Sequence, residues 1–206
     1  MKKEEQEKKI KVSLILLASG FGKRYGANKL LEEYGGKKLY QTALQTAVKS
    51  GADLVVIVTG YREIADYVKH FYKEVQVVWN EHPQRGISES LKLGLMAAEE
   101  NEGCGFLVCD QPGLSVESLE NLLESFRAAP SRIHLCCYGQ RRGNPVIFPR
   151  KYYGELKMLT GDLGGRQVIK KYPDQVTEIP VASEVELWDI DTAEDKERME
   201  KQQKIK

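Results

Sequence analysis

The sequence predicts a single-domain α/β fold of three layers, α/β/α, in which helices cover both faces of a mostly parallel sheet. Over the first two thirds of the chain, apolar runs of strand length alternate with segments of helical periodicity, a pattern typical of parallel β-α-β units. The 206 residues suit one such domain. No repeat and no Pro- or Ser-rich linker divides them, so we expect one domain over residues 12–202 after a flexible, charged lead-in at residues 1–11.

Largely apolar runs predict the first four strands, at residues 12–18, 54–58, 75–79 and 106–109. Amphipathic segments predict helices at residues 40–50, 62–72, 88–100 and 116–129. Gly51 follows the first helix and Pro130 the last, because glycine favours the position after a helix and the residue before proline leaves helical geometry. Residues 30–39 are predicted as a short segment around the Gly35-Gly36 turn, and the polar residues 80–86 as a loop.

The last third of the chain mixes shorter elements. Strands are predicted at residues 133–138 and 145–148, around a basic turn at 140–143, and again at 176–181 and 186–189. Helical segments are predicted at residues 151–158, between the glycine-rich turn at 161–165 and Lys171, and at 192–202. The chain is therefore expected to end in a charged helix.

The charge balance gives no reason to expect a polyanionic partner. Charged residues make up 30 % of the chain and the formal net charge is +1, so neither nucleic acid nor an anionic membrane is predicted. No apolar run has the length of a membrane span, and the charged N-terminus has no signal-peptide core, so we expect a cytoplasmic protein. The four cysteines lack metal-site spacing and are expected to be buried apolar side chains; the three histidines receive no role.

A glycine-rich, cationic loop follows the first strand. Its three glycines let the backbone turn sharply and leave its N–H groups bare, while Lys23, Arg24 and Lys29 add three cations. Bare amides and fixed cations at the carboxyl end of a strand predict a polyphosphate site. A plain surface turn with solvated cations is the alternative, but glycines and cations are seldom this dense in such a turn.

Two common phosphate-binding loops do not fit this stretch. The Walker loop needs Ser or Thr after Gly-Lys, but Gly22-Lys23 is followed by Arg24. The dinucleotide fingerprint needs its third glycine three residues after the second, whereas Gly26 comes four after Gly22. The third interpretation is a nucleotidyltransferase loop, in which Arg and Lys hold a triphosphate whose pyrophosphate leaves.

The segment Leu17-Ala18-Ser19-Gly20-x-Gly22-x-Arg24-x-Gly26-x-x-Lys29 resembles the Leu-Ala-Ala-Gly-x-Gly-x-Arg-Met-Gly-x-x-Lys signature of nucleoside-triphosphate transferases, and is most similar to the MobA-like molybdenum-cofactor nucleotidyltransferases. Ser19 and Tyr25 depart from the signature. The resemblance implies a Rossmann-like nucleotidyltransferase fold of the nucleotide-diphospho-sugar transferase type. It implies that Arg24 and Lys29 are catalytic cations on the β- and γ-phosphates. It also implies nucleotide binding by Leu17, Ala18, Ser19, Gly20, Gly22, Lys23, Arg24, Lys29, Gly86, Ser88, Ser90 and Asp110.

A triphosphate needs a divalent cation, and the cation needs carboxylates. Asp110 ends a predicted strand in Cys109-Asp110-Gln111-Pro112, where it is either a ligand at the sheet edge or part of a turn or helix cap near Ser115. The Asp-Gln-Pro sequence resembles the metal-binding Asp-x-Pro motif of these transferases, which implies that Asp110 is catalytic and binds Mg²⁺.

A second carboxylate is expected from Asp189 or Asp191. Alternation in an extended segment puts both on one face, and the segment resembles the family's terminal Asp-Ile-Asp-Thr-Pro-Glu-Asp element. Both residues are therefore candidate Mg²⁺ ligands, with Asp191 ahead by analogy. The alternative for Asp191 is the N-cap of the last helix.

Three further segments carry the resemblance. Gly86-Ile87-Ser88-Glu89-Ser90-Leu91 opens a helix that Ser88 or Ser90 would cap, and it also resembles the family's nucleotide-contacting Gly-x-Ser-x-Ser-Leu. Two later segments resemble the acceptor-side Gly-His-Pro and Thr-Gly-Asp-x-Gly-Ala-Arg of the family. They imply acceptor binding by Gly143, Asn144, Pro145, Gly161, Asp162 and Arg166. Arg141 and Arg142 are either further contacts for an acceptor phosphate or a solvated charge run.

The resemblance implies a Mg²⁺-dependent enzyme that transfers CMP from CTP to molybdopterin and releases pyrophosphate. CTP is preferred to GTP because guanylyl-transferring relatives resemble Leu-Ala-Gly-Gly where this chain has Leu-Ala-Ser-Gly. A guanylyltransferase, or a transferase for another phosphorylated acceptor, is the first alternative. A non-catalytic nucleotide- or cofactor-binding delivery protein is the second. A molybdenum hydroxylase is the implied recipient partner.

Overall fold

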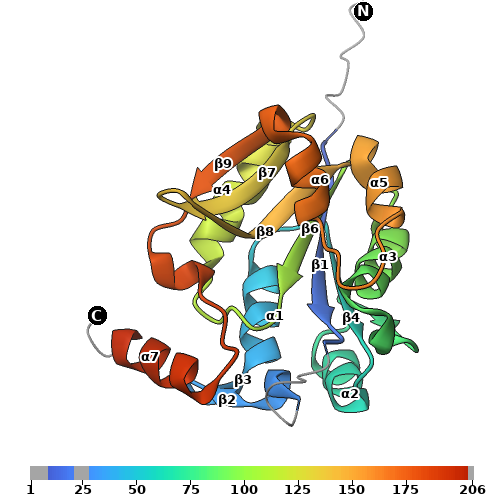
Figure 1. Cartoon of the computed structure of the whole chain (residues 1–206). Helices are drawn as coiled ribbons and strands as arrows, with labels where there is room; N and C mark the ends of the chain where they lie inside the picture. The colour runs from blue at the N-terminus through green and yellow to red at the C-terminus, as the bar shows by residue number, and fades with distance from the viewer. Residues whose placement is uncertain (1–8, 21–27, 204–206) are drawn as a thin grey trace, which may run out of the picture.

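The computed structural model describes residues 9–20 and 28–203. Its centre is a seven-stranded sheet in the order β5-β4-β1-β6-β8-β7-β9 (Figure 1). The strands of this sheet are β1 (Val12–Ala18), β4 (Leu54–Thr59), β5 (Gln76–Trp79), β6 (Gly103–Val108), β7 (Ile133–Tyr138), β8 (Arg141–Pro149) and β9 (Val176–Pro180). A separate two-stranded hairpin is made by β2 (Glu33–Tyr34) and β3 (Lys37–Lys38).

The sheet is mostly parallel, as predicted. The pairs β5-β4, β4-β1, β1-β6 and β7-β9 are parallel, and only β8 runs against its neighbours β6 and β7. Strands β1, β4 and β6 therefore all end at one edge of the sheet. Ser19, Gly60 and Cys109 directly follow these three strands.

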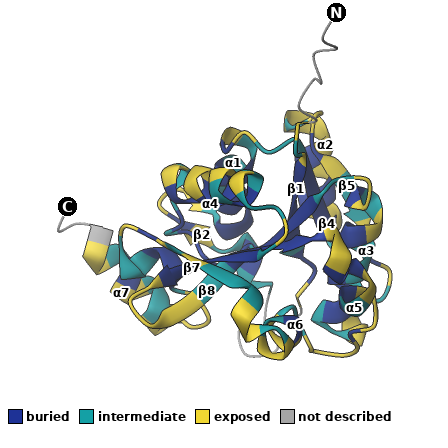
Figure 2. Ribbon diagram, turned by 90° about the horizontal axis from the view of Figure 1, so that it is seen from above, coloured by how far each residue is buried: buried dark blue, intermediate teal, exposed yellow. Residues whose placement is uncertain are grey.

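Helices cover both faces of the sheet, which confirms the three-layer prediction (Figure 2). One face carries α1 (Leu39–Lys49), α2 (Arg62–Phe71) and α4 (Val116–Ala128), and the other carries α3 (Ile87–Ala98), α5 (Tyr153–Lys157) and α6 (Arg166–Lys171). The last helix, α7 (Ala193–Gln203), lies beside the β2-β3 hairpin in Figure 1. Short 3₁₀ segments are η1 (Lys29–Leu31), η2 (Pro83–Arg85), η3 (Arg150–Tyr152), η4 (Pro173–Gln175) and η5 (Glu184–Leu187).

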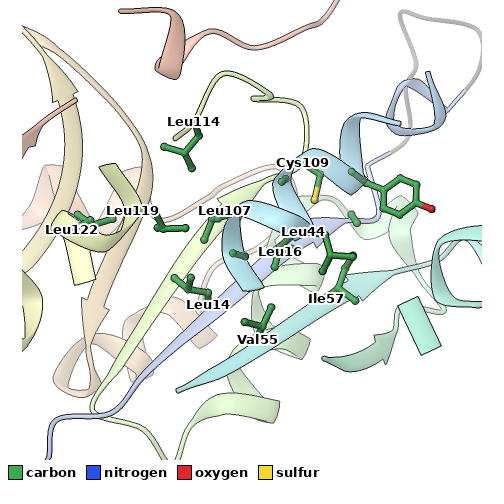
Figure 3. Close-up of a cluster of buried hydrophobic side chains, with 14 of the residues drawn as sticks. Leu14, Leu16, Leu44, Val55, Ile57, Leu107, Cys109, Leu114, Leu119 and Leu122 are labelled. Atoms are coloured by element: carbon green, nitrogen blue, oxygen red, sulfur yellow. The ribbon is translucent and has the colours of Figure 1, made fainter. Parts of the chain in front are cut away.

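Strand β1 separates two hydrophobic clusters. Leu14 and Leu16 point into the cluster under α1 and α4, where Figure 3 shows them beside Leu44 and Leu107. Ile15 points the other way, into the cluster under α3. A Cβ added at Gly94 of α3 would come within 2.2 Å of Ile15, so this glycine lets α3 approach the strand closely. A strand buried on both faces explains the unbroken apolar run of residues 12–18.

Two strand predictions of the last third are wrong in their details. The predicted basic turn at 140–143 lies mostly inside β8, because Gly139, with φ of 56°, and Gln140 are sufficient to reverse the chain. Arg142 extends the strand and forms an ion pair with Glu178 of β9 at 2.6 Å. Residues 186–189 are not a strand. Residues 186 and 187 belong to the 3₁₀ turn η5, which Ser183 caps by accepting a hydrogen bond from the Val185 N–H, and residues 188 and 189 follow it without regular structure.

The cysteines are as predicted, and no helix within residues 9–20 and 28–203 has the length and hydropathy of a membrane span. All four cysteines are free and buried. Burial raises the pKa of Cys104 and of Cys136 to about 12, so both remain neutral thiols at ordinary pH.

Candidate active site

A pocket of about 320 Å³ opens at the edge of the sheet where β1 and β6 end. The end of β1 contributes Leu17, Ser19 and Gly20, and the end of β6 contributes Val108, Cys109 and Asp110. Lys29 and Leu30 of η1 also line the pocket. Its opposite wall comes from η2, the start of α3 and the loop before α6, through Pro83, Gln84, Gly86, Ile87, Ser90 and Asp162. Ligands of open α/β sheets bind at such an edge.

Lys29 joins two carboxylates that are far apart in the sequence. Its ammonium nitrogen lies 2.6 Å from Asp110 Oδ2 and 2.6 Å from Asp191 Oδ1. The two carboxylate oxygens therefore lie no farther apart than the sum of these two nitrogen–oxygen distances. The side chains of Lys29 and Asp110 are 19 % and 18 % exposed, and Asp191 is 49 % exposed, so the group lies at the pocket rim with Asp191 facing solvent.

The loop after β6 and the segment after η5 are held together by several hydrogen bonds. The Ile190 N–H donates to the Asp110 carbonyl at 2.9 Å, and Gln111 Nε2 donates to Asp189 Oδ1 at 2.7 Å. Gly113 also allows close approach, because a Cβ there would lie 2.4 Å from the Val185 carbonyl oxygen. These contacts place both late aspartates beside Asp110.

A buried carboxylate, Glu186, reinforces the same junction. Its Oε2 accepts from the backbone N–H of Ser115 at 3.0 Å and from the Ser115 hydroxyl at 2.8 Å. Its Oε1 accepts from the Ala182 N–H at 3.1 Å. Glu186 is 5 % exposed, and these bonds to donors compensate for the burial of its charge.

Neither Asp110 nor Asp191 caps a helix, although Asp110 does lie in the turn that follows β6. Ser115 caps α4 by accepting from the Ser118 N–H. Thr192 and Asp195 cap α7 reciprocally, because Asp195 N–H donates to Thr192 Oγ1 at 3.1 Å and Thr192 N–H donates to Asp195 Oδ2 at 2.9 Å. The carboxylates of Asp110 and Asp191 both remain directed to Lys29.

The charges of the group perturb one another. Burial by itself would lower the pKa of the Lys29 ammonium, but its contacts with Asp110 and Asp191 outweigh this effect and raise the pKa above its usual 10.5. Partial desolvation raises the pKa of Asp189 above its usual 3.8, and the negative charges of Asp110 and Asp191 add to that rise. Lys29 is therefore a fixed cation, and the aspartates form a site at which negative charge is concentrated.

The donor set fits a divalent cation that is shared with a phosphate ligand. Asp110 Oδ1 is buried and has no hydrogen-bond partner among the described residues, so it has lone pairs available. Over residues 9–20 and 28–203, no three His, Cys, Asp or Glu side chains are grouped as a complete metal site. Mg²⁺ is usually held by one or two carboxylates together with substrate phosphates, so a site that offers only Asp110 and Asp191 would suit an ion shared with a phosphate ligand.

The predicted serines have structural partners. Ser19 Oγ donates to the Val58 carbonyl at 3.1 Å, which ties the end of β1 to β4, and Ser90 Oγ accepts from Asn80 Nδ2 at 3.1 Å. Neither Ser88 nor Ser90 caps α3, whose N-cap is Gly86. The Ser88 N–H donates to the Gly161 carbonyl at 3.1 Å, so the start of α3 is tied to the loop before α6.

The predicted acceptor residues separate into different places. Gly161 and Asp162 lie against Gly86, at the wall of the large pocket. Gly143 packs against Leu187, and Asn144-Pro145 is a cis peptide within β8. Arg166 begins α6.

Of the residues predicted to bind the nucleotide, Leu17 and Ala18 are the last residues of β1, and Gly22, Lys23 and Arg24 lie outside the described residues.

Sequence reasoning missed the parts of the site that depend on long-range contacts. Glu186 was placed in a strand, and Gln111 was noted only as the middle of a motif. Pro83 and Gln84 were assigned to a loop without a role. Glu186 alternates with Glu184 and apolar residues in the sequence, so no local signal marks Glu186 as the buried carboxylate.

The chain is similar to known proteins over most of its length. The sequence model described as MobA-like NTP transferase domain matches residues 14–176. Nicotine blue oxidoreductase of Paenarthrobacter nicotinovorans is 32 % identical over 197 residues, which cover 91 % of this chain and 96 % of that protein. Purine catabolism protein PucB of Bacillus subtilis (strain 168) is 28 % identical over 191 residues, covering 88 % and 92 %.

Solved structures are similar over the same span. Rv0371c from Mycobacterium tuberculosis H37Rv has a TM-score of 0.79 and 26 % identity, with 93 % of this chain and 98 % of that chain covered. The complex of Rv0371c with manganese has a TM-score of 0.77 and 25 % identity, with 92 % and 97 % covered.

Proposed function

Because the chain belongs to the MobA-like NTP transferase family, we propose that it transfers CMP from CTP to the terminal phosphate of molybdopterin and releases pyrophosphate. The observation that carries the proposal is the position of the Lys29 ammonium, 2.6 Å from both Asp110 and Asp191 at the rim of the pocket. A cation next to two carboxylates suits a triphosphate bound together with a divalent metal.

The proposed reaction requires alignment and charge stabilisation from the protein more than acid–base catalysis. An anionic oxygen of the acceptor phosphate attacks the α-phosphorus of CTP, the bond from that phosphorus to the bridging oxygen breaks, and pyrophosphate leaves with the electron pair. Since the attacking oxygen is already ionised, no strong general base is required. Alignment of the two substrates and stabilisation of charge are the main contributions.

The residues divide these tasks. Lys29 and Arg24, the latter outside the described residues, would hold the β- and γ-phosphates and help pyrophosphate leave. Asp110 and Asp191 would hold the divalent cation, with Asp189 beside them. A bound Mg²⁺ supplies positive charge to the phosphate oxygens. The manganese complex of the similar Rv0371c supports a divalent cation in this fold.

The pocket wall at the start of α3 suits the nucleoside. Gly86 and Ile87 line the pocket there, and α3 begins beside them with the positive end of its dipole. Ser88 and Ser90 hold this wall in place through their contacts with Gly161 and Asn80. The proposal includes a cytoplasmic location and a molybdenum hydroxylase as recipient of the product.

A second candidate comes from the relative with 32 % identity, whose name is that of an oxidoreductase. In that case the nucleotide pocket would take a redox dinucleotide instead of a triphosphate. GTP in place of CTP, another phosphorylated acceptor, and binding without turnover are the remaining alternatives.

Pyrophosphate release tests these possibilities. The protein is incubated with Mg²⁺, molybdopterin and each of the four triphosphates in turn, with NADH and NADPH oxidation followed separately. We expect release that depends on molybdopterin and is fastest with CTP. Faster release with GTP would reassign the base, oxidation of NADH or NADPH without pyrophosphate release would favour the oxidoreductase, and tight CTP binding without turnover would favour a delivery protein. Asp66→Asn, an exposed acidic residue of α2, is the matched control for Asp110→Asn.

A further inference from the structure

A smaller pocket of about 160 Å³ lies on the other side of the Lys29 group. It is lined by Arg141 at the start of β8, by Trp188, Asp189 and Asp191 after η5, and by Asp195 and Arg198 of α7. None of its residues belongs to the wall of the larger pocket. The small pocket is therefore a distinct concavity, formed mostly by the C-terminal part of the chain.

The two pockets meet at one ion pair. Asp191 lines the small pocket, and Lys29, which binds it at 2.6 Å, lines the large one. Lys29 also binds Asp110, another residue of the large pocket. Molecules held in the two pockets would thus approach each other at Lys29 and Asp191. Nucleotidyl transfer needs this relationship, because the attacking and leaving oxygens lie on opposite sides of the transferred phosphorus.

We propose that the small pocket binds the acceptor, as an anionic group of the phosphomonoester class carried on a planar ring, with Arg198 and Arg141 as its cationic contacts. The assignment of this ligand as acceptor rests on the proposed function, whereas the binding itself does not.

Arg198 is held in position by Trp188. Its guanidinium carbon lies 3.7 Å from the centroid of the indole ring, a close cation–π contact. No described residue accepts a hydrogen bond from Arg198, so the N–H groups along its edge are available to an anion. Arg198 is exposed, and a guanidinium stacks on aromatic rings as well as binding phosphate through two N–H groups.

Arg141 approaches the same pocket from the sheet. Its guanidinium donates to the Leu187 carbonyl at 3.0 Å, which fixes the side chain beside Trp188, and makes only a long contact of 3.4 Å with Glu184. Arg142, the next residue of β8, is instead paired with Glu178 of β9. Arg142 is therefore a matched control for Arg141.

The carboxylates of the pocket already have partners. Asp195 Oδ2 accepts from the Thr192 and Asp191 N–H groups at the start of α7, Asp189 accepts from Gln111, and Asp191 binds Lys29. Lys29, Arg141 and Arg198 carry three positive charges against the five negative charges of Asp110, Asp189, Asp191, Asp195 and Glu184, which contacts Arg141. A divalent cation at Asp110 and Asp191 would cancel this excess of two negative charges and so remove the net repulsion of an anion.

Binding of phenyl phosphate tests the proposal directly. The chain has two tryptophans, so Trp79→Phe leaves Trp188 as the single indole and makes its fluorescence a reporter of the small pocket. In the Trp79→Phe protein with Mg²⁺, we expect phenyl phosphate to change this fluorescence saturably, and Arg198→Ala or Arg141→Ala to weaken binding at least about tenfold. Arg142→Ala and Lys201→Ala, on the same strand and the same helix, should bind within about twofold of the parent protein.

The affinity for CTP, measured by calorimetry on the same proteins, separates the two pockets. We expect the CTP affinity to be equal in the Trp79→Phe parent and its four variants. We also expect phenyl phosphate to bind in the presence of saturating CTP. Absence of phenyl phosphate binding, unchanged binding in Arg198→Ala and Arg141→Ala, equal weakening in the control variants, or displacement by CTP would each overturn the proposal. If phenyl phosphate binds as expected but no triphosphate releases pyrophosphate, the proposed function fails and the pocket assignment stands.

Discussion

The backbone N–H of Ile190 donates to the carbonyl oxygen of Asp110 at 2.9 Å, and this bond joins the loop after β6 to the segment that carries Asp189 and Asp191. A main-chain bond between the two segments fixes the separation of their side chains. The Lys29 ammonium then binds a carboxylate from each segment. The candidate active site is therefore assembled by the packing of the C-terminal segment against the sheet edge.

Glu186→Gln should destabilise the protein by about 1–3 kcal/mol, because the amide would place an N–H group against Ser115 or Ala182, both of which donate hydrogen bonds to the carboxylate. Urea unfolding at neutral pH measures the change. Glu184→Gln, a partly exposed neighbour, should change stability by less than about 0.5 kcal/mol. Equal stability of Glu186→Gln and the parent protein would show that the junction does not depend on this carboxylate.

Lys29→Gln should lower the rate of pyrophosphate release by about 100- to 1,000-fold, because it removes a fixed cation from the phosphate position. Lys49→Gln, on an exposed position of α1, is the control for loss of one positive charge. A rate for Lys29→Gln within a fewfold of the control would remove Lys29 from the catalytic machinery.

Gly86→Ala should destabilise the protein by about 1–3 kcal/mol. Gly86 has φ of 86°, and a Cβ there would lie 2.4 Å from the Gly161 carbonyl oxygen. Gly154→Ala is the matched control: it lies in α5 with nothing within 4 Å of the new Cβ. Since alanine is the better helix former, it should be neutral or stabilise by up to about 1 kcal/mol. Thermal unfolding of the two variants compares them, and similar melting temperatures would contradict the close packing at Gly86.

Stability should fall as the pH is lowered below about 6.5, through the buried His134. Burial lowers the pKa of His134, so the unfolded chain binds the proton at a higher pH than the folded chain does. The stabilisation is thus complete above the unfolded pKa and is lost as the pH falls toward the folded one. Urea midpoints from pH 7.5 to 5.5 should decrease, less steeply in His134→Gln than in the exposed control His70→Gln. Parallel curves for the two variants would exclude His134 as the source.

Much of the fold follows from local patterns. The unbroken apolar runs at β1 and β4 predicted strands buried on both faces, and alternation with helices predicted the parallel sheet. Asp110 was predicted at the sheet edge because it directly follows such a run. These inferences need only neighbouring residues.

Features decided by distant contacts could not be predicted in the same way. The pattern of residues 186–189 is compatible with a strand, but the conformation depends on Glu186 meeting Ser115, 71 residues earlier. Asp191 was a candidate helix cap until the Thr192–Asp195 pair was seen to take that role. Ser19 lines the pocket where the nucleotide is predicted, but the bond from its hydroxyl to the Val58 carbonyl of the neighbouring strand could not be predicted from the sequence.

The central claim is that a nucleotide and a divalent cation meet at Lys29, Asp110 and Asp191. Its most direct test is the affinity for Mn²⁺ in the presence of CTP, measured by electron paramagnetic resonance for the parent protein, Asp110→Asn and the surface control Asp66→Asn. We predict that Asp110→Asn weakens Mn²⁺ binding at least about tenfold while Asp66→Asn leaves it unchanged. Mn²⁺ binding by a folded Asp110→Asn protein as tight as that of the parent would contradict the claim.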